Sequence, residues 1–173
     1  MERAFLGDSY DAVKRMWQEL LAGWAPLYAE PRFIPKELRP DFEKLTRISM
    51  LKDQRPRTYS ILNDPCTGIR LPSRPKQSEG QKHVSIETII RQLKNGAQCV
   101  VTFDQSIYRN VGMKPKEQRQ AKMRRLAEDE FHSFYYVSHA PFLFAFPNKE
   151  TLKKVEGILK AAGIPQNRIE KIS

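Results

Sequence analysis

The sequence is poor in the residues that build disulfide frameworks and zinc sites. It holds two cysteines, Cys66 and Cys99, which do not form a CxxC pair, and its three histidines are scattered along the chain. Two cysteines are too few for a disulfide scaffold, and no two candidate ligands have the spacing of a zinc finger. The composition therefore argues against a disulfide-rich secreted domain and against a structural zinc module.

Long apolar runs are missing as well. A membrane-spanning helix needs about 20 consecutive apolar residues, and the longest candidate, 134–146, is interrupted by Ser138, His139 and Pro141. Residues 1–8 lack the apolar stretch of a secretory signal. We therefore expect a cytoplasmic protein with no membrane partner.

Acidic residues are outnumbered by basic ones. The chain has 30 Lys and Arg against 20 Asp and Glu, a formal net charge of +10. Such a surplus on a small domain favours polyanionic partners, because each cation placed on a phosphate releases a counterion. We expect a nucleic acid, DNA or RNA, as the partner. A basic face that docks on an acidic protein is the alternative.

The hydrophobic pattern predicts strands that alternate with helices. Alternation implies crossover connections and a mostly parallel sheet with helices on its faces. The short connection 139–141 between two aromatic strands implies an antiparallel hairpin. We therefore expect a single three-layer, Rossmann-like α/β domain over residues 1–173, with a C-terminal antiparallel hairpin and a mobile basic loop at 70–82.

The boundaries follow from apolar periodicity and from turn residues. The expected helices cover 8–22, 41–51, 85–95, 115–129 and the stretch from Asn148 to Gly163, and the expected strands cover 4–6, 27–29, 58–62, 98–103, 133–138, 142–146 and 164–172. No internal repeat and no second-domain boundary is visible, so one domain accounts for the whole chain.

Three aspartates, Asp8, Asp64 and Asp104, come directly after expected strands. Ligands of open α/β sheets bind beyond the carboxyl ends of strands, so these side chains can converge on one edge. Carboxylates hold Mg²⁺ or Mn²⁺, which stabilise an attacking water and a leaving phosphate oxygen. One hypothesis is therefore a metal-dependent nuclease or phosphodiesterase using these residues, with Asp11 as a further candidate. In the other, Asp8 caps a helix, and Asp64 and Asp104 stabilise turns.

The segment Asn63-Asp64-Pro65 invites comparison with a known enzyme motif. It resembles the Asp/Asn-Pro-Pro-aromatic motif that ends a strand in Rossmann-type amino-methyltransferases. The order of the following elements, a helix, a strand, a helix and a C-terminal hairpin, is similar to the second half of that fold. The resemblance implies that the first polar residue and backbone carbonyls of this loop bind an amino group that is to be methylated.

The opening of the chain carries a second resemblance. Asp11, Val13 and Lys14 match the Asp-Val-x-Lys-His opening of the ribosomal RNA adenine methyltransferase family, and Arg15 stands where that family has histidine. The resemblance implies a Rossmann-like domain that acts on nucleic acid.

Two departures change what the resemblance implies. Cys66 and Thr67 replace the second proline and the aromatic residue of the amino-methyltransferase motif. Residues 24–57 contain no glycine, so the loop that receives S-adenosylmethionine after the family's first strand is missing. We therefore predict no bound cofactor, and a degenerate methyltransferase-like protein rather than an active methyltransferase.

A cluster of cations marks the expected helix 115–129. Cations on one side of a helix can contact the same phosphate track, and cations of the loop 70–82 can extend it. A helix face that is only solvated is the alternative interpretation. The candidate nucleic-acid-binding residues are Arg74, Lys76, Arg109, Lys116, Arg119, Lys122, Arg124 and Arg125.

Ser138 and His139 do not make a nucleophile and its base. Neighbouring residues of a strand point to opposite faces, so we expect His139 to be structural or to lie in a turn. The leading hypothesis is therefore a nucleic-acid-binding α/β protein. The alternatives are the nuclease, with Mg²⁺ or Mn²⁺ held by Asp8, Asp64 and Asp104, and a basic module that docks on an acidic protein.

Overall fold

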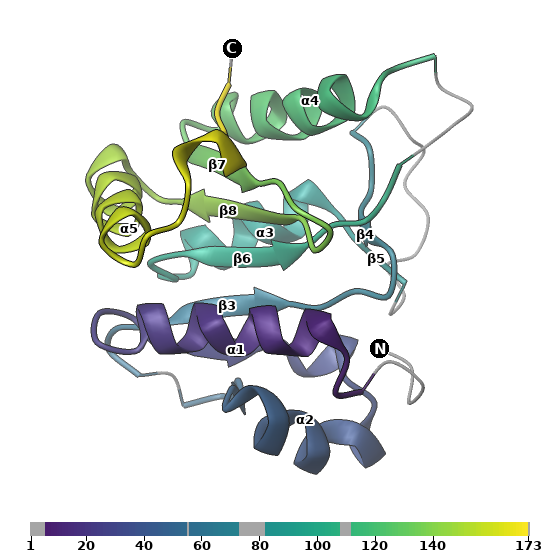
Figure 1. The fold of residues 1–173 in the computed structure, drawn as a ribbon, viewed down its shortest axis with the longest axis vertical. Coiled ribbons are helices and arrows are strands. Elements are labelled where there is room, and N and C mark those ends of the chain that lie inside the picture. Colours follow the sequence, from purple (N-terminus) through teal and green to yellow (C-terminus); the bar gives the residue numbers. More distant parts are fainter. Residues whose placement is uncertain (1–5, 55, 73–81, 108–111, 173) are drawn as a thin grey trace.

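The computed structural model describes residues 6–54, 56–72, 82–107 and 112–172. One mixed sheet has the strand order β2-β1-β3-β6-β8-β7-β9 (Figure 1). Strands β2, β1, β3, β6 and β7 share one direction, whereas β8 and β9 run the opposite way. The strands are β1 (Leu27–Ala29), β2 (Ser49–Met50), β3 (Ser60–Asn63), β6 (Val100–Phe103), β7 (His132–Tyr136), β8 (Phe142–Phe146) and β9 (Ile169–Glu170).

Five α-helices are found among the described residues, and the α/β class expected from the sequence is confirmed. Two further strands, β4 (Gly68–Ile69) and β5 (His83–Val84), pair in parallel as a separate small sheet. The α-helices are α1 (Ser9–Leu21), α2 (Arg39–Thr46), α3 (Ile86–Lys94), α4 (Pro115–Ala127) and α5 (Lys149–Ala161), and the 3-10 turns are Pro31–Phe33, Lys36–Leu38 and Gln166–Arg168. None of the described helices is long and apolar enough to cross a bilayer.

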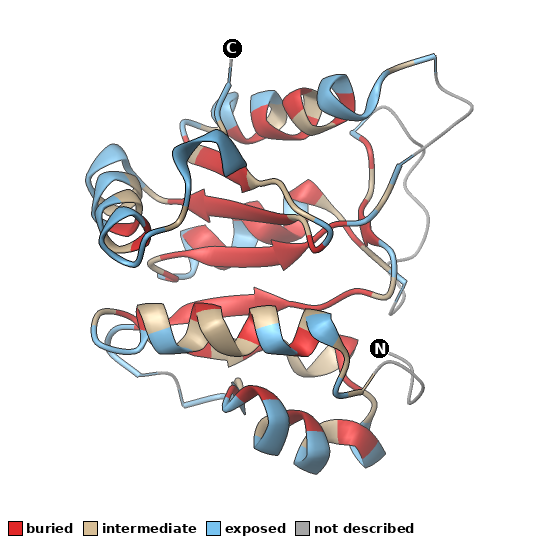
Figure 2. Cartoon of the chain, viewed as in Figure 1, coloured by how far each residue is buried: buried red, intermediate tan, exposed pale blue. Residues whose placement is uncertain are grey.

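Both faces of the sheet are covered, because neighbouring strand residues point to opposite sides. Val101 of β6 packs in a hydrophobic cluster with Trp17 of α1, Phe42 of α2 and Val155 of α5. The central strands are consequently buried along their whole length (Figure 2).

The second face carries its own cluster. Val100, the neighbour of Val101, packs there with Ile89 of α3 and Met123 of α4. The two clusters lie on opposite sides of the same strands, so α1, α2 and α5 cover one face, and α3 and α4 cover the other.

Side-chain caps set the beginnings of three helices. Asp8, Ser85 and Asn148 accept hydrogen bonds from backbone N–H groups in the first turns of α1, α3 and α5. These groups have no partner within the helix, and a capping oxygen satisfies them. The positions of these helices were therefore predicted correctly from the sequence.

The expected helix 41–51 ends early, and its last residues form a strand instead. The Thr46 hydroxyl donates to the Phe42 carbonyl at 2.7 Å, and Arg47 adopts a left-handed φ of 59°, which ends the helix. Ser49 and Met50 then pair with β1. The strand expected at 4–6 lies mostly outside the described residues.

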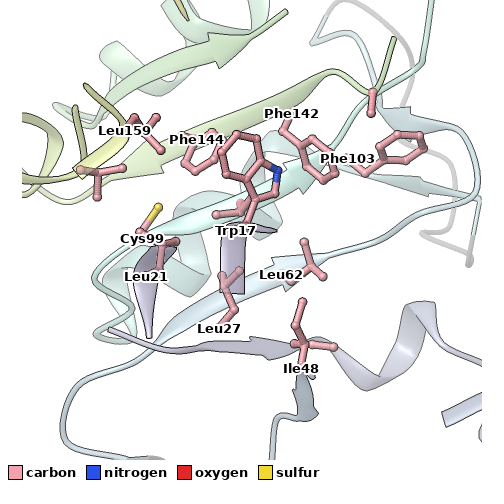
Figure 3. Packing of buried hydrophobic residues seen from close by; sticks show 14 of the residues in the cluster. Trp17, Leu21, Leu27, Ile48, Leu62, Cys99, Phe103, Phe142, Phe144 and Leu159 are labelled. Carbon is pink, nitrogen blue, oxygen red and sulfur yellow. The ribbon is translucent and has the colours of Figure 1, made fainter. Parts of the chain in front are cut away.

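Trp17 is the largest completely buried side chain of the structure (Figure 3). Its ring meets Tyr136, Phe142 and Phe144 edge-on, with centroids 4.9, 6.0 and 5.1 Å away. Edge-to-face aromatic contacts add to the free energy of burial, so Trp17 fixes α1 to the sheet.

We expect Trp17→Ala to lower the free energy of unfolding by about 3–5 kcal/mol, because it leaves a large cavity in the core. Urea denaturation followed by circular dichroism measures this loss. Trp24→Ala is the control: Trp24 is only half-buried, and a loss equal to that of Trp17→Ala would contradict the central role of Trp17.

Candidate functional site

The carboxyl ends of β3 and β6 carry two of the aspartates predicted for this edge of the sheet. Asp64 follows β3 and Asp104 follows β6, and their exposed fractions are only 4% and 5%. The two strands are parallel neighbours, with Asn63 paired opposite Thr102. The sequence therefore located this pair correctly at one edge, and the partners of each carboxylate decide what it can do.

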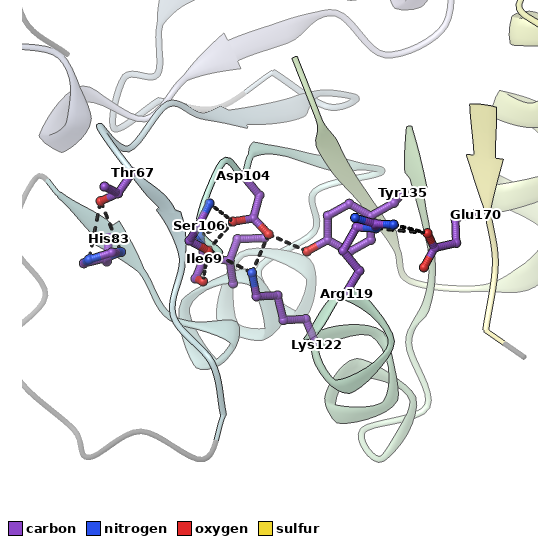
Figure 4. A network of polar contacts seen from close by, with 9 residues as sticks. All are labelled: Thr67, Ile69, His83, Asp104, Ser106, Arg119, Lys122, Tyr135 and Glu170. Atoms are coloured by element: carbon purple, nitrogen blue, oxygen red, sulfur yellow. Dashed lines mark hydrogen bonds and ion pairs between the residues drawn. The ribbon is translucent and has the colours of Figure 1, made fainter. Parts of the chain in front are cut away.

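Asp104 joins four segments of the chain (Figure 4). Its Oδ1 accepts from the Ile69 backbone N–H at 2.8 Å, from the Ser106 N–H at 3.2 Å and from the Ser106 hydroxyl at 2.5 Å. Its Oδ2 accepts from the Lys122 ammonium at 2.6 Å and from the Tyr135 hydroxyl at 2.7 Å. Ile69 lies in β4, Lys122 in α4 and Tyr135 in β7. We call Asp104 and the residues bonded to it, Ile69, Ser106, Lys122 and Tyr135, the Asp104 hub.

The backbone of β4 approaches the hub so closely that only glycine fits. A Cβ atom at Gly68 would overlap the Asp104 carboxylate, and the φ angle of Gly68 is 129°. The Ser106 hydroxyl also lies 2.7 Å from the Ile69 carbonyl. The beginning of the 70–82 segment is therefore fixed against the end of β6.

Burial changes the titration of two hub residues. Lys122 has no exposed surface, and burial lowers the pKa of its ammonium from 10.5, although the charge of Asp104 acts in the opposite direction. Burial and the negative charge of Asp104 raise the pKa of the Tyr135 hydroxyl well above its ordinary range. Tyr135 therefore stays protonated at neutral pH and can donate to Asp104.

Asp64 belongs to a second buried cluster. The Lys14 ammonium donates to Asp64 Oδ2 and to Asp11 Oδ1, both at 2.9 Å. The other Asp11 oxygen accepts from the Gly7 backbone N–H at 2.7 Å. Burial alone would lower the pKa of Lys14, but the two carboxylates outweigh it and raise that pKa above 10.5. The cation holds the first turn of α1 to the end of β3.

Asp8 caps α1, as one of the two sequence hypotheses expected. Its Oδ1 accepts from the N–H groups of Tyr10 at 2.8 Å and of Asp11 at 3.2 Å. Each of the candidate aspartates thus already serves a lysine or a backbone N–H group. Within the described residues, no three metal-ligating side chains gather in one place. The hydrogen bonds of these aspartates are structural ones, made to backbone N–H groups and to lysines.

Asn63 also makes its hydrogen bonds inside the protein. Its amide group donates to Gln92 Oε1 at 2.8 Å and to the Thr102 hydroxyl at 3.2 Å. Its carbonyl oxygen accepts from the Gln92 amide at 2.9 Å. Asp64, which aligns with the first polar residue of the methyltransferase motif, is the next residue and is bonded to Lys14 in the same buried region.

The predicted cations of α4 divide into buried, paired and exposed groups. Lys122 is completely buried in the hub, because it lies on the helix face that packs on the sheet, so we withdraw it from the nucleic-acid-binding candidates. Arg119 pairs with Glu170 at 2.6 Å. Lys116 and Arg124 are exposed, as expected of residues that contact phosphates.

Arg125 is half-buried and forms an ion pair with Asp129 at 2.6 Å. A second carboxylate oxygen, Glu87 Oε1, lies 3.6 Å from Arg125 Nε. Arg125 is therefore largely neutralised by its neighbours. The remaining candidates, Arg74, Lys76 and Arg109, lie outside the described residues.

Several contacts at this edge were not predicted from the sequence. Tyr135 and Ser106 were not assigned to any polar cluster, yet both bind Asp104. Tyr10 and His139 come from opposite ends of the chain, and their rings stack with centroids 5.8 Å apart. No local pattern links such distant residues, so only the fold reveals them.

Asp104→Asn is expected to lower the free energy of unfolding by about 3–5 kcal/mol, because it leaves the buried Lys122 charge without its counter-ion. Chemical denaturation measures the loss. Adding Lys122→Met should recover part of it, since the double variant buries no unpaired charge. No recovery in the double variant would contradict the ion pair as the cause.

The two buried lysines should respond to alkaline pH in opposite ways. The pKa of Lys122 is lowered, so between that pKa and 10.5 the unfolded chain binds more protons and this residue's contribution to stability rises with pH. The pKa of Lys14 is raised, so its contribution persists up to 10.5 and is lost at still higher pH. The difference in unfolding free energy between the unmodified protein and Lys122→Met should rise with pH below 10.5, whereas the difference for Lys14→Met should stay constant there and fall only above 10.5. Parallel curves would contradict the assignment.

The chain has no detectable similarity to known proteins in three comparisons. No family model matches it, and no curated protein and no solved structure matches it at a significant level. A functional interpretation therefore depends on the geometry and charge described above.

Proposed function

We propose that the protein is a nucleic-acid-binding α/β domain of Rossmann-like, methyltransferase-like architecture that does not itself transfer methyl groups. The observation that carries the proposal is the Asp104 hub. It joins the beginning of the basic 70–82 segment, through Ile69, to the basic helix α4, through Lys122. The residue directly before the basic 70–82 segment, Ile69, is thereby held beside the basic helix α4.

The distribution of charge supports a polyanionic partner. Among the described residues, the buried charged ones are three aspartates and two lysines, Asp11, Asp64, Asp104, Lys14 and Lys122. Since the whole chain has a net charge of +10, its positive surplus is not made up of these buried residues. A surplus at the surface raises the affinity for phosphates through counterion release.

The placement of α4 supports a phosphate contact near the strand ends. The N-terminal end of α4 lies on the side of the molecule where β4 and β5 are found (Figure 1). Lys114 and Lys116 are exposed at this end of the helix, and Arg124 is exposed further along it. Cations spaced along a helix in this way can follow a nucleic-acid backbone.

The order of the elements supports the methyltransferase-like part of the proposal. The motif residues Asn63, Asp64 and Pro65 directly follow or end β3, and α3, β6, α4 and the pair β7–β8 come next. The loss of methyl transfer is inferred from two features. A 3-10 turn at Pro31–Phe33 follows β1 where the family has its glycine-rich loop, and the carboxylate of Asp64, the first polar residue of the motif, is bonded internally to Lys14.

We expect the double variant Lys116→Gln/Arg124→Gln to weaken nucleic-acid binding, and the slope of log affinity against log salt to fall by about 2, one for each lost phosphate contact. Fluorescence anisotropy with labelled single-stranded and double-stranded DNA and RNA, at several salt concentrations in EDTA, measures both quantities.

The matched control is Lys44→Gln/Lys160→Gln, which removes two exposed cations from α2 and α5 on the other face of the sheet. Equal losses in both double variants would indicate general charge attraction and contradict a site at α4. No binding of the unmodified protein to any probe would overturn the proposal in favour of an acidic protein partner. Cleavage of the probe when Mn²⁺ replaces EDTA would instead support the nuclease.

A further inference from the structure

A row of aromatic rings runs from the core to the strand-end edge of the sheet. Trp17 meets Phe142 with ring centroids 6.0 Å apart, Phe142 meets Phe103 at 5.4 Å, and Phe103 meets Tyr10 at 5.3 Å. His139 is the last ring and stacks on Tyr10 at 5.8 Å with an interplanar angle of 25°. Because each inner ring is packed against the next, the outermost pair has a firm support.

The exposed His139 ring stacks on Tyr10, and hydrogen bonds hold the residues next to both rings. The Ser138 hydroxyl lies 3.0 Å from the Ala140 carbonyl and accepts from the Ala140 N–H at 3.1 Å, which holds the turn between β7 and β8. On the other side, the Gln105 amide donates to the Tyr10 hydroxyl. Exposed aromatic surface that is held in one orientation needs little further ordering when a flat ligand binds.

The surroundings of this ring pair are those of a ligand-binding edge. Tyr10 begins α1, His139 follows β7, and Gln105 and Ile107 follow β6, so all lie beyond the same strand ends. Ile107 is 58% exposed and adds apolar surface there. Ligands of open α/β sheets bind at this edge, on the side where the N-terminal end of α4 also lies (Figure 1).

We infer that the Tyr10–His139 ring pair is a stacking platform for one unpaired base of a nucleic acid. The inference rests on the proposed function and adds to it the class of ligand, a single strand or a flipped nucleotide rather than an intact duplex. Every base presents a flat π-face, so stacking on such a platform tolerates any sequence, and a paired base inside a duplex cannot reach it. The exposed cations of α4 then hold the phosphates.

The test compares His139→Ala with the unmodified protein, using an oligothymidylate of about 12 nucleotides, a length within the range bound by single-strand-binding domains. We expect the affinity for this single strand to fall about 5- to 150-fold, the usual effect of removing a base-stacking ring. The affinity for a duplex of the same length should not change. His139→Phe keeps a flat ring and should restore the affinity.

A fluorescent base gives a second readout that a general loss of stability would not move. A 2-aminopurine placed in the oligothymidylate changes its fluorescence when it stacks on a ring, and this change should be present with the unmodified protein and with His139→Phe but absent with His139→Ala.

His132→Ala is the matched control. His132 begins β7, at the opposite end of the strands from His139, and lines an open hollow together with Lys149, Lys153 and Lys171. We expect this variant to bind the single strand as the unmodified protein does. A loss confined to His132→Ala would place the nucleic acid in that hollow and overturn the inference.

The outcomes separate the platform from the proposed function. If His139→Ala binds the single strand normally while Lys116→Gln/Arg124→Gln binds weakly, the platform is overturned and the proposed function stands. Equal losses for single strand and duplex also overturn the platform, because they indicate a change in charge or structure. If the unmodified protein binds no nucleic acid, the proposed function fails first.

Discussion

Much of this structure depends on the hydrogen bonds and the ion pair of one buried carboxylate, that of Asp104. Asp104 follows the central strand β6 and is bonded to β4, α4 and β7. A buried ion pair adds little stability compared with an apolar core, but the loss of one partner is costly. The Asp104 hub therefore specifies the arrangement of these elements more than it stabilises the domain.

The Asp104 hub and the ion pairs of Lys14 with Asp11 and Asp64 lie at the strand ends of this sheet. Strand-end carboxylates that could act on a ligand are bonded to lysines from α1 and α4. The edge still presents a supported aromatic pair and exposed cations, which can bind without reacting. This arrangement supports the proposal of binding without chemistry.

The sequence predicted the elements whose signals are local and missed those that depend on distant partners. Helix α3 has four apolar residues at helical spacing and a serine cap, and it was located within one residue. Strands β2, β4 and β5 have two residues each, so only their pairing partners define them. Lys122 was misjudged because its charge suggested a surface position. Its spacing of four from Leu126, a buried residue of the same helix, was the signal for burial.

The pairing of β4 with β5 allows the sequence between these two strands to vary. The two strands hold together the ends of the segment that lies between them in the sequence. The backbone N–H groups of Thr67 and Arg70 donate to the carbonyl oxygens of Lys82 and Val84. The entropy lost on closing a loop grows only slowly with its length. Insertions, deletions and substitutions between β4 and β5 should therefore leave the seven-stranded sheet intact. Evolution can therefore lengthen or recompose this one segment without altering the core.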